Sequence, residues 1–422
     1  MSLGLQWLSG LTPGEWLRFG GGSVELFFAL VFGFVGLVAI LYSAVRVRAG
    51  ARRLVEYYCF LVLLLASAVG LVYARNLILA FTAWELATLS LWRLVAFFRT
   101  EDDVRAGTWA LLVNFGATTF MLVGVAMLLL QFGSLEYDKL AGASIGVVPA
   151  VLVLIGILAK SATLPLYVWM PRAYRQAPAP VCALLSGVAE NLGIVLFFRL
   201  FVQTFSVPAG FLEFVAGLAL VSSLVAGAVA LAQKSLRSTL AYSTISQLGF
   251  IFLGLAVAGY YGILGALLYV LAHAVAKSGL FFAAGLVEDS AGTGEFERLG
   301  GVTRRAPVLA TAAALLVLSI VGLPPLVGFF AKLGVVLAAL ENSVLLGVGA
   351  IVAALFTVLY LARLYTRVFL GADRVGAWRP ANRFAVFLVV LMALVSLGAG
   401  VTACWKIPFL ERAIAGLAGG LW

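Results

Sequence analysis

Charged residues, cysteine and histidine are all scarce in this sequence of 422 residues. Only 11% of the residues carry a charge, against about 25% in an average soluble domain, and 64% are hydrophobic, with a mean hydropathy of +1.12. A soluble globule needs a polar outer layer and cannot hide this much apolar surface. The same numbers exclude a disordered chain and a fibrous repeat. They leave an all-α polytopic membrane protein.

The few cysteines and the single histidine limit the chemistry of the chain. Cys59, Cys182 and Cys404 lie singly in apolar stretches, and no CxxC motif occurs. Zinc, haem and iron–sulfur sites need several such ligands, so we expect no metal and no cofactor. A P-loop motif and a GxGxxG motif after a strand are also absent from the sequence. We therefore expect no catalytic chemistry in this chain, and energy supplied by an ion gradient or a partner protein.

The net charge of +10 has two readings, nucleic-acid binding or basic cytoplasmic loops. The cytoplasmic loops of membrane proteins carry an excess of Lys and Arg, which gives the same number. We therefore expect no nucleic-acid partner.

Apolar residues gather in twelve predicted membrane spans. We expect one transmembrane domain over residues 24–405, preceded by an interfacial segment over 1–23 that does not resemble a signal peptide, and followed by a tail over 406–422. The tenth span is too long for one straight helix and is either two helices or one broken helix. The spans are Val24–Ala44, Val55–Tyr73, Asn76–Phe98, Thr108–Gln131, Ile145–Met170, Ala179–Val202, Ala209–Ala232, Thr239–Gly259, Tyr261–Val287, Pro307–Leu340, Ser343–Ala362 and Phe384–Trp405.

Loop charges decide how often the tenth span crosses the membrane. With one crossing, eighteen Lys and Arg fall on one side and six on the other, and the richer side is cytoplasmic by the positive-inside rule. Two separate helices would spoil this asymmetry. We therefore predict about twelve helices in a prokaryotic inner membrane, with both termini outside. The cytoplasmic set is Arg46, Arg48, Arg52, Arg53, Arg99, Arg105, Arg172, Arg175, Lys234, Arg237, Arg298, Arg304, Arg305, Arg363, Arg367, Arg374, Arg379 and Arg383; the outer set is Arg18, Arg75, Lys139, Arg199, Lys406 and Arg412.

Proline and glycine interrupt two of the spans. The fifth is interrupted at Ser161–Pro165 and the tenth at Gly322–Pro325, which contains Pro324 and Pro325. Broken helices at corresponding places in two halves are typical of inverted-repeat transporters, where the unwound backbone faces a polar cavity. We predict repeats over approximately 55–202 and 209–362. The alternative is that each proline only kinks its helix.

Six titratable residues fall near the middle of predicted spans. Each costs about 2.5–3.5 kcal/mol at a helix centre, or roughly 15 kcal/mol together. We predict that they form a row of proton-relay groups linked by water. The residues are Glu85, Lys160, Glu190, His273, Lys277 and Lys332.

Simpler interpretations of these residues stay open. Glu85 and Lys160 could form a static ion pair, and His273 could be an ordinary hydrogen-bonded core group. Arg93 lies toward the cytoplasmic end of its span and is expected to snorkel. Polar residues are also expected to line the channel, or else to hold helices together. These residues are Asn191, Ser243, Thr244 and Gln247.

Several segments resemble the antiporter-like subunits of respiratory complex I, of energy-converting membrane hydrogenases and of multi-subunit cation/proton antiporters. The match runs in order from about Val55 to Phe369. Its motifs are Trp84-Glu85-Leu86, Ala159-Lys160-Ser161-Ala162-Thr163-Leu164-Pro165, Trp169-Met170-Pro171-Arg172-Ala173, Cys182-Ala183-Leu184-Leu185-Ser186-Gly187-Val188, Leu240-Ala241-Tyr242-Ser243-Thr244-Ile245-Ser246-Gln247-Leu248-Gly249, His273-Ala274-Val275-Ala276-Lys277, Leu299-Gly300-Gly301 and Gly322-Leu323-Pro324-Pro325 with Gly328-Phe329 and Lys332.

The resemblance implies a role for each part of the row. Glu85 and Lys160 would be the coupled pair of a first half-channel, His273 and Lys277 would line the central water path, and Lys332 would serve the second half. Related subunits usually carry a lysine where this chain has Asn191, so Glu190 either replaces it or the bridge between the halves is broken.

The resemblance also implies a function and partners. We expect a proton-translocating, non-redox subunit of a complex-I-like or hydrogenase-type assembly, working with other membrane subunits and the lipid bilayer. The alternatives are a sodium/proton antiporter subunit, a membrane partner of an inorganic-carbon uptake complex, or a scaffold subunit with an inactive channel.

Overall fold

The structure is a computed structural model of the chain that describes residues 19–404. Most of the predicted interfacial segment and the tail over 406–422 lie outside these residues, as do Arg18, Lys406 and Arg412. Throughout the described range the chain folds into helices joined by short loops, with four isolated β-bridges and no β-strand. The all-α prediction is therefore confirmed.

Ten stretches of helix in this range are long and apolar enough to cross a membrane. Nine of them are single helices, and the tenth, Ala179–Thr204, is a composite of four segments. The single helices are α3 (Ser23–Arg46), α4 (Ala51–Tyr73), α5 (Leu77–Val95), α6 (Glu101–Phe132), α12 (Phe211–Ala232), α13 (Leu236–Val257), α14 (Gly259–Ala291), α18 (Val344–Val368) and α19 (Arg383–Cys404). The composite contains α10 (Ala179–Leu184), the π-helix η1 (Leu185–Ala189), α11 (Asn191–Phe197) and the π-helix η2 (Phe198–Thr204).

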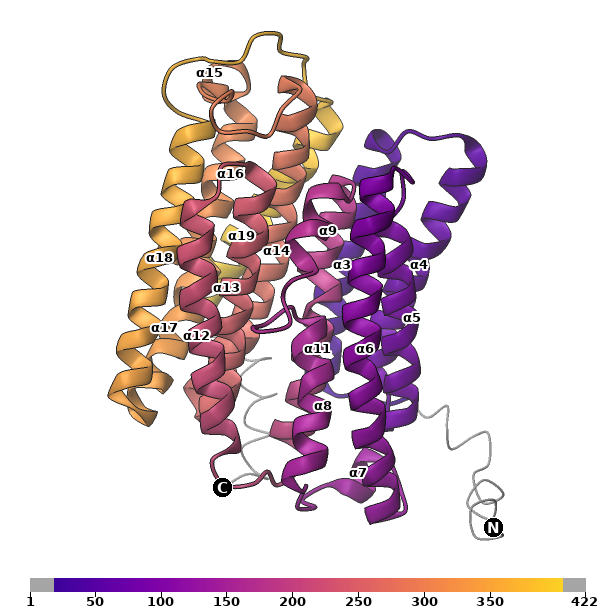
Figure 1. Cartoon of the computed structure of the whole chain (residues 1–422). Coiled ribbons are helices and arrows are strands. Elements are labelled where there is room, and N and C mark those ends of the chain that lie inside the picture. The colour runs from indigo at the N-terminus through magenta and orange to yellow at the C-terminus, as the bar shows by residue number, and fades with distance from the viewer. Residues whose placement is uncertain (1–18, 405–422) are drawn as a thin grey trace.

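The fifth and tenth predicted spans are broken helices. α8 (Val147–Lys160) is followed by an irregular segment and then by α9 (Met170–Gln176), and α16 (Pro307–Val321) is followed by a shorter gap and then by α17 (Val327–Asn342). In Figure 1 the two halves of each broken helix occupy opposite ends of the bundle. The total of twelve crossings stays a prediction, because only the ten unbroken stretches have the length of a complete span. The short helices α7 (Tyr137–Leu140) and α15 (Val302–Arg305) lie in loops.

Two isolated β-bridges occupy corresponding places in the halves of the chain. One joins Asn76, before α5, to Glu136, after α6; the other joins Ser235, before α13, to Glu295, after α14. This recurrence supports the predicted inverted repeats, which stay a prediction.

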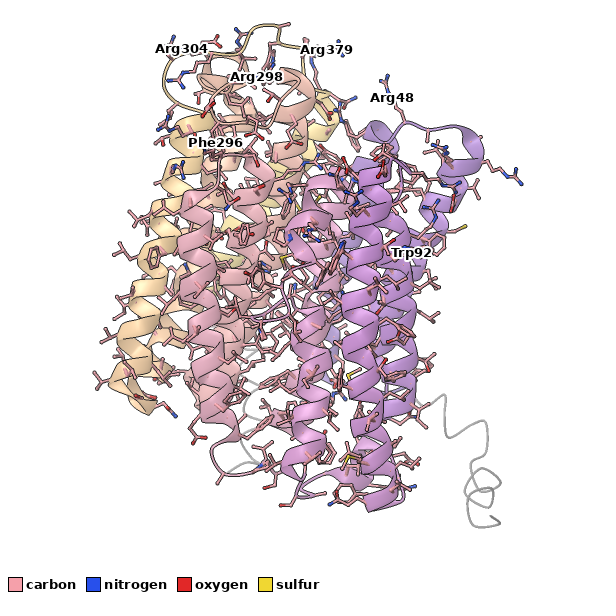
Figure 2. The ribbon with its side chains drawn as sticks, viewed as in Figure 1. Arg48, Trp92, Phe296, Arg298, Arg304 and Arg379 are labelled. Atoms are coloured by element: carbon pink, nitrogen blue, oxygen red, sulfur yellow. The ribbon has the colours of Figure 1, made fainter. Side chains whose placement is uncertain are left out.

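The basic residues gather at one end of the bundle. Figure 2 shows Arg48, Arg298, Arg304 and Arg379 on loops at that end. Arg75 and Lys139 are in the loops joined to the other ends of α4, α5 and α6. These members of the two predicted sets of basic residues thus lie at opposite ends of the bundle.

Three stretches form the centre of the bundle. The composite Ala179–Thr204, α13 and α14 are buried over 100%, 89% and 94% of their apolar windows, against 39% for α4, α6, α18 and α19. Glu190, His273 and Lys277 all lie on these central helices. The middle of the predicted row is therefore within the protein and away from lipid.

Candidate functional site

Lys160 is the last residue of α8, at the first break in the bundle. The turn is made by Ala162, which has a φ of +43°, and the Trp169 indole Nε1 donates a hydrogen bond of 2.9 Å to the carbonyl oxygen of Ala159. Pro165 follows and has no backbone N–H to continue a helix. The helix thus ends inside the bundle, with the buried Lys160 as its last residue.

The Lys160 ammonium group is held by neutral partners. It donates to the Thr88 hydroxyl, lies 3.5 Å from the Trp84 carbonyl oxygen and is 4.8 Å from the centre of the Trp84 ring. No ion pair joins Lys160 to Glu85 within the part of the chain that the structure describes. The static pair considered from the sequence is therefore not formed here.

Glu85 lies at the end of the predicted row that is nearest the side of the bundle. It is partly buried, and its Oε1 has no hydrogen-bond partner in the described chain. Glu85 and Thr88 supply polar side chains to a cavity of about 610 Å³ on the side of the bundle, between α5 and α6. The remaining side chains that line this cavity are apolar or belong to Thr82. The row thus begins at the edge of the protein.

Glu190 and Asn191 lie between the two π-helical segments of the composite span. The Tyr174 hydroxyl donates to Glu190 Oε1 at 2.8 Å, and the Ser161 hydroxyl donates to the Glu190 carbonyl oxygen at 2.7 Å. The Asn191 amide donates to the carbonyl oxygens of Ser186 and Gly187 at 3.0 and 3.2 Å, inside η1. The wider π turns let a side chain reach these carbonyls, and such turns are frequent at functional sites.

Lys277 begins a chain of polar side chains in the second half of the bundle. Its ammonium group donates to the Ser243 hydroxyl, which donates to the Tyr360 hydroxyl at 3.1 Å. The Gln247 amide nitrogen donates to the same Tyr360 oxygen at 2.6 Å, and its carbonyl oxygen accepts from the Tyr269 hydroxyl. Gln247 therefore fixes two tyrosine hydroxyls between Lys277 and the second break.

Lys332 lies at that second break. Its ammonium group is 3.4 Å from the carbonyl oxygen of Val321, the last residue of α16, and its nitrogen is 5.1 and 5.8 Å from the ring centres of Phe250 and Tyr269. Gly322, with a φ of +89°, turns the chain out of the helix. The Lys332 side chain thus extends from α17 back to the end of α16.

Glycines let the broken helices approach their neighbours closely. A Cβ atom at Gly328 would lie 1.8 Å from the carbonyl oxygen of Ser319 in α16, so only hydrogen fits. At Gly193, a Cβ atom would lie 2.1 Å from the Ser161 hydroxyl oxygen. The same Cβ atom at Gly193 would lie 2.8 Å from the Ile157 carbonyl oxygen, so the backbones approach closely at both breaks.

His273 and Thr244 complete the predicted set. His273 is fully buried one turn before Lys277, and neither of its ring nitrogens has a partner in the described chain. Thr244 lies 3.3 Å from the Ser186 hydroxyl, which joins α13 to η1. Seven buried side-chain polar atoms in residues 19–404 have no partner, and five of them belong to Glu85, Glu190, Asn191 and His273.

Buried or half-buried arginines behave differently from these lysines. Arg93 pairs with Glu56, Arg199 with Glu25 at 2.5 Å, and Arg237 with Glu288 at 2.6 Å. Arg199 is counted from the sequence among outer loop residues, but the structure buries it in η2. Arg93 was expected only to extend its side chain toward the membrane surface, and in the structure it forms an ion pair with Glu56.

Sequence reasoning missed the neutral side chains that contact the predicted row. Thr88, Tyr269 and Tyr360 sit in apolar stretches, where a hydroxyl does not stand out, and Tyr174 lies between two arginines outside the predicted spans. A buried tyrosine hydroxyl needs a partner, so the tyrosines inside the predicted spans, Tyr269 and Tyr360, carried a usable signal. The two π-helical segments left none that we can identify in the sequence.

The fold and the row of buried lysines define an antiporter-like membrane subunit. Residues 74–357 match the family model described as "NADH:quinone oxidoreductase/Mrp antiporter, TM". The chain therefore belongs to this family, and the resemblance seen in its motifs is confirmed.

Curated relatives come from two kinds of complex. The chain is 32% identical over 393 residues to NADH-quinone oxidoreductase subunit N of Desulforudis audaxviator, covering 88% of this chain and 78% of the relative. It is 31% identical to a Na(+)/H(+) antiporter component of Alkalihalophilus pseudofirmus, covering 85% of this chain but 48% of the relative. The chain thus spans about half the length of that antiporter component.

Two solved structures share the fold. A chain of the Mrp complex from Dietzia sp. superposes with a TM-score of 0.86, covering 97% of this chain and 86% of that one. A chain of the membrane-bound sulfane sulfur reductase, described as an archaeal respiratory membrane complex, gives 0.82, covering 91% of this chain and 66% of that one. Both are 23% identical to this chain, so they bear on the fold alone.

Proposed function

We propose that this subunit carries protons across a prokaryotic inner membrane along the row from Glu85 to Lys332, inside a redox-driven assembly of membrane subunits. One observation carries the proposal. Lys160, Lys277 and Lys332 are buried, and among the residues described none of the three forms an ion pair with a carboxylate. Their ammonium groups contact hydroxyls, carbonyl oxygens and aromatic rings instead.

The choice of residue type supports proton transfer. A buried charge without a counter-charge is costly, and a lysine can remove that cost by releasing its proton. Arginine stays charged, so a buried arginine needs a carboxylate. The arginines Arg199 and Arg237 have such partners. The lysines are thus placed to change charge, and these arginines are placed to hold helices together.

The path has two stretches of different character. From Lys277, hydroxyls of Ser243, Tyr360 and Tyr269 lead toward Lys332, with Gln247 as a positioning residue. Between Lys160 and Lys277, Glu190 Oε2 and both ring nitrogens of His273 lack partners in the described chain, and buried polar groups normally have one. We infer that internal water serves these atoms and completes the path there.

Glu190 takes the role that related subunits give to a lysine at the position of Asn191. Its carboxyl group has one hydrogen bond, from Tyr174, and one oxygen available to water. Asn191 uses its amide for the carbonyls of η1, which is a structural task. This arrangement favours an active channel over the scaffold alternative.

Orientation and partners follow from charge and shape. We infer that the basic end faces the cytoplasm, with both termini outside. The cavity beside Glu85 opens on the side of the bundle, which puts the first group of the row within reach of a neighbouring membrane subunit. Since curated relatives include Na(+)/H(+) antiporter subunits, exchange of protons for sodium is the second candidate function.

The test uses the chain with its native partner subunits in proteoliposomes. Proton movement is followed with a pH-sensitive dye, driven by the redox substrate of the assembly or by an imposed sodium gradient. Lys277→Ala should abolish redox-driven proton movement, while Lys234→Ala, at an exposed lysine of a loop, should leave it unchanged. Full pumping by Lys277→Ala would refute the proposal. Proton movement that appears only with the sodium gradient would replace it by the antiporter function.

A further inference from the structure

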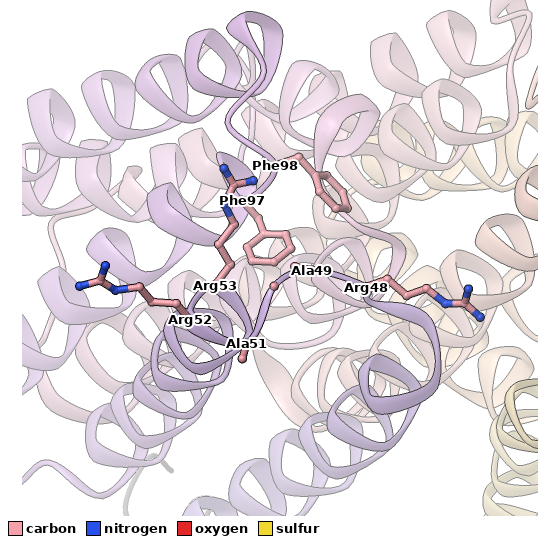
Figure 3. A pocket seen from close by; sticks show the side chains of 8 residues that line it. Arg48, Ala49, Ala51, Arg52, Arg53, Phe97 and Phe98 are labelled. Atoms are coloured by element: carbon pink, nitrogen blue, oxygen red, sulfur yellow. The ribbon is translucent and has the colours of Figure 1, made fainter.

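A separate cavity lies at the basic end, away from the row of lysines. It has a volume of about 320 Å³ and lies between residues 48–53, which run from the loop after α3 into the first turn of α4, and the aromatic pair Phe97 and Phe98 beyond the end of α5. Figure 3 shows Ala49 close to the Phe97 ring, Arg53 beside that ring, and Arg48 and Arg52 pointing to opposite sides. The cavity therefore has an apolar floor and a basic rim.

The charge on this rim is not neutralised within the described chain. Arg48, Arg52 and Arg53 are exposed, and none forms an ion pair with an acidic residue of 19–404. Other arginines of the same region do: Arg46 pairs with Asp289, and Arg99 with Glu56 at 2.8 Å. The rim thus keeps three flexible guanidinium groups available to an anion.

The start of α4 adds to this positive potential. Its N-cap is Gly50, which offers no side-chain hydrogen bond, and its first turn contains Arg52 and Arg53 but no acidic residue. α6, at the same end, has the usual arrangement, with a Thr100 cap and three acidic residues in its first turn. Since the N-terminal end of a helix is itself positive, arginine there is unfavourable unless an anion is present.

An apolar groove on α4 continues from the same place. It has a volume of about 670 Å³ and is lined by Leu54, Val55, Tyr58, Cys59, Val62, Leu63 and Ala66. Val55 and Val62 are 65% and 55% exposed. From Val55 to Ala66 the helix rises by about 16 Å, close to half of a hydrocarbon core of about 30 Å. The groove therefore has the length of one leaflet.

We propose that this cavity and groove together bind an anionic glycerophospholipid. The phosphate of the headgroup lies against the guanidinium groups of Arg48, Arg52 and Arg53, and an acyl chain follows the groove along α4. Basic pockets on the cytoplasmic side of membrane helices suit anionic headgroups. The positive rim and the leaflet-long groove together fit a lipid better than an apolar helix of a neighbouring subunit, which would leave the arginines without an anion. This site is independent of the proposed proton path.

Cys59 provides a probe within the groove. It is exposed, while Cys182 is buried. A fluorophore on Cys59, in a chain whose two other cysteines are replaced by alanine, can be quenched by lipids with brominated acyl chains. The assembly is placed in nanodiscs containing equal small fractions of brominated phosphatidylglycerol or brominated phosphatidylcholine. We expect clearly stronger quenching by phosphatidylglycerol.

Substitutions at the rim test the charge. Each arginine near an anionic headgroup contributes about a fivefold preference, so Arg52→Gln with Arg53→Gln should remove most of the difference between the two lipids. Arg298→Gln with Arg304→Gln is the matched control, since these arginines are also exposed at the basic end but lie away from Arg48 in Figure 2. The control should keep the full preference.

A second measurement is free of the label. Native mass spectrometry of the unlabelled assembly should show retained phosphatidylglycerol that the rim variant loses. Equal quenching by both lipids in the unsubstituted rim would refute the proposal. Absence of quenching by either lipid would also overturn it, because the groove would then be covered by a neighbouring subunit.

Discussion

Tyr360 offers a sharp test of the path between Lys277 and Lys332. Its hydroxyl oxygen accepts hydrogen bonds from Ser243 at 3.1 Å and from the Gln247 amide at 2.6 Å. Tyr360→Phe removes this oxygen and keeps the ring, so the apolar packing of α18 is preserved. The two donors lose their common acceptor, and the row loses one hydroxyl between Lys277 and Tyr269.

The expected size of the effect follows from these two bonds. A neutral hydrogen bond contributes about 0.5–1.5 kcal/mol, so the variant should be less stable by about 1–3 kcal/mol. If only about 1.4 kcal/mol of this appears in the barrier to proton transfer, transport slows about tenfold. We therefore expect proton movement to fall about tenfold while the subunit still assembles.

Tyr42→Phe is the matched control. Tyr42 is a fully buried tyrosine whose hydroxyl donates to the Phe282 carbonyl oxygen at 3.0 Å, away from the lysines. Its loss should lower stability by about 1 kcal/mol and leave transport close to normal. The assay is dye-monitored proton movement in proteoliposomes, normalised to the amount of assembled complex. Equal transport by Tyr360→Phe and Tyr42→Phe would show that the Tyr360 hydroxyl has no part in the path.

Three further changes test other parts of the row. Glu190→Gln keeps the size of the side chain but cannot release a proton, so pumping should fall to background with normal assembly; normal pumping would favour the inactive-scaffold alternative. Lys332→Arg keeps a positive charge that cannot be released, so it should block proton movement along the row; proton movement at the normal rate would exclude Lys332 from the path. Gly328→Ala places a Cβ atom 1.8 Å from the Ser319 carbonyl oxygen and should cost about 1–3 kcal/mol or more, seen as a lower melting temperature, whereas Gly116→Ala, with open space around it, should be neutral.

Apolar spans and charge positions predict much of this fold. A lysine in the middle of an apolar stretch stands out, so Lys160, Lys277 and Lys332 could be found from the sequence, and loop arginines assigned the helix directions. Proline and glycine marked both breaks, because proline cannot donate a helix hydrogen bond.

The partners of those lysines could not be predicted in the same way. Thr88 meets Lys160 and Tyr360 meets the Ser243 bound to Lys277 only through packing between helices far apart in the chain. The absence of a Glu85–Lys160 ion pair also depends on side-chain positions that spacing does not determine. Arg199 was misplaced for a related reason. A basic residue near the end of a span resembles a loop residue, and only the structure shows Glu25 beside it.

The close contacts at Gly193 and Gly328 have a mechanical consequence. At Gly328 the two halves of the second broken helix touch each other, and at Gly193 α11 touches the end of α8, in both places with no room for a methyl group. We expect this close packing to hold the backbone around the breaks, so that rotation about the side-chain bonds of Lys160 and Lys332 is the main motion there. Such rotations occur far faster than the rearrangement of whole helices. We therefore expect turnover to respond little to the thickness of the surrounding bilayer.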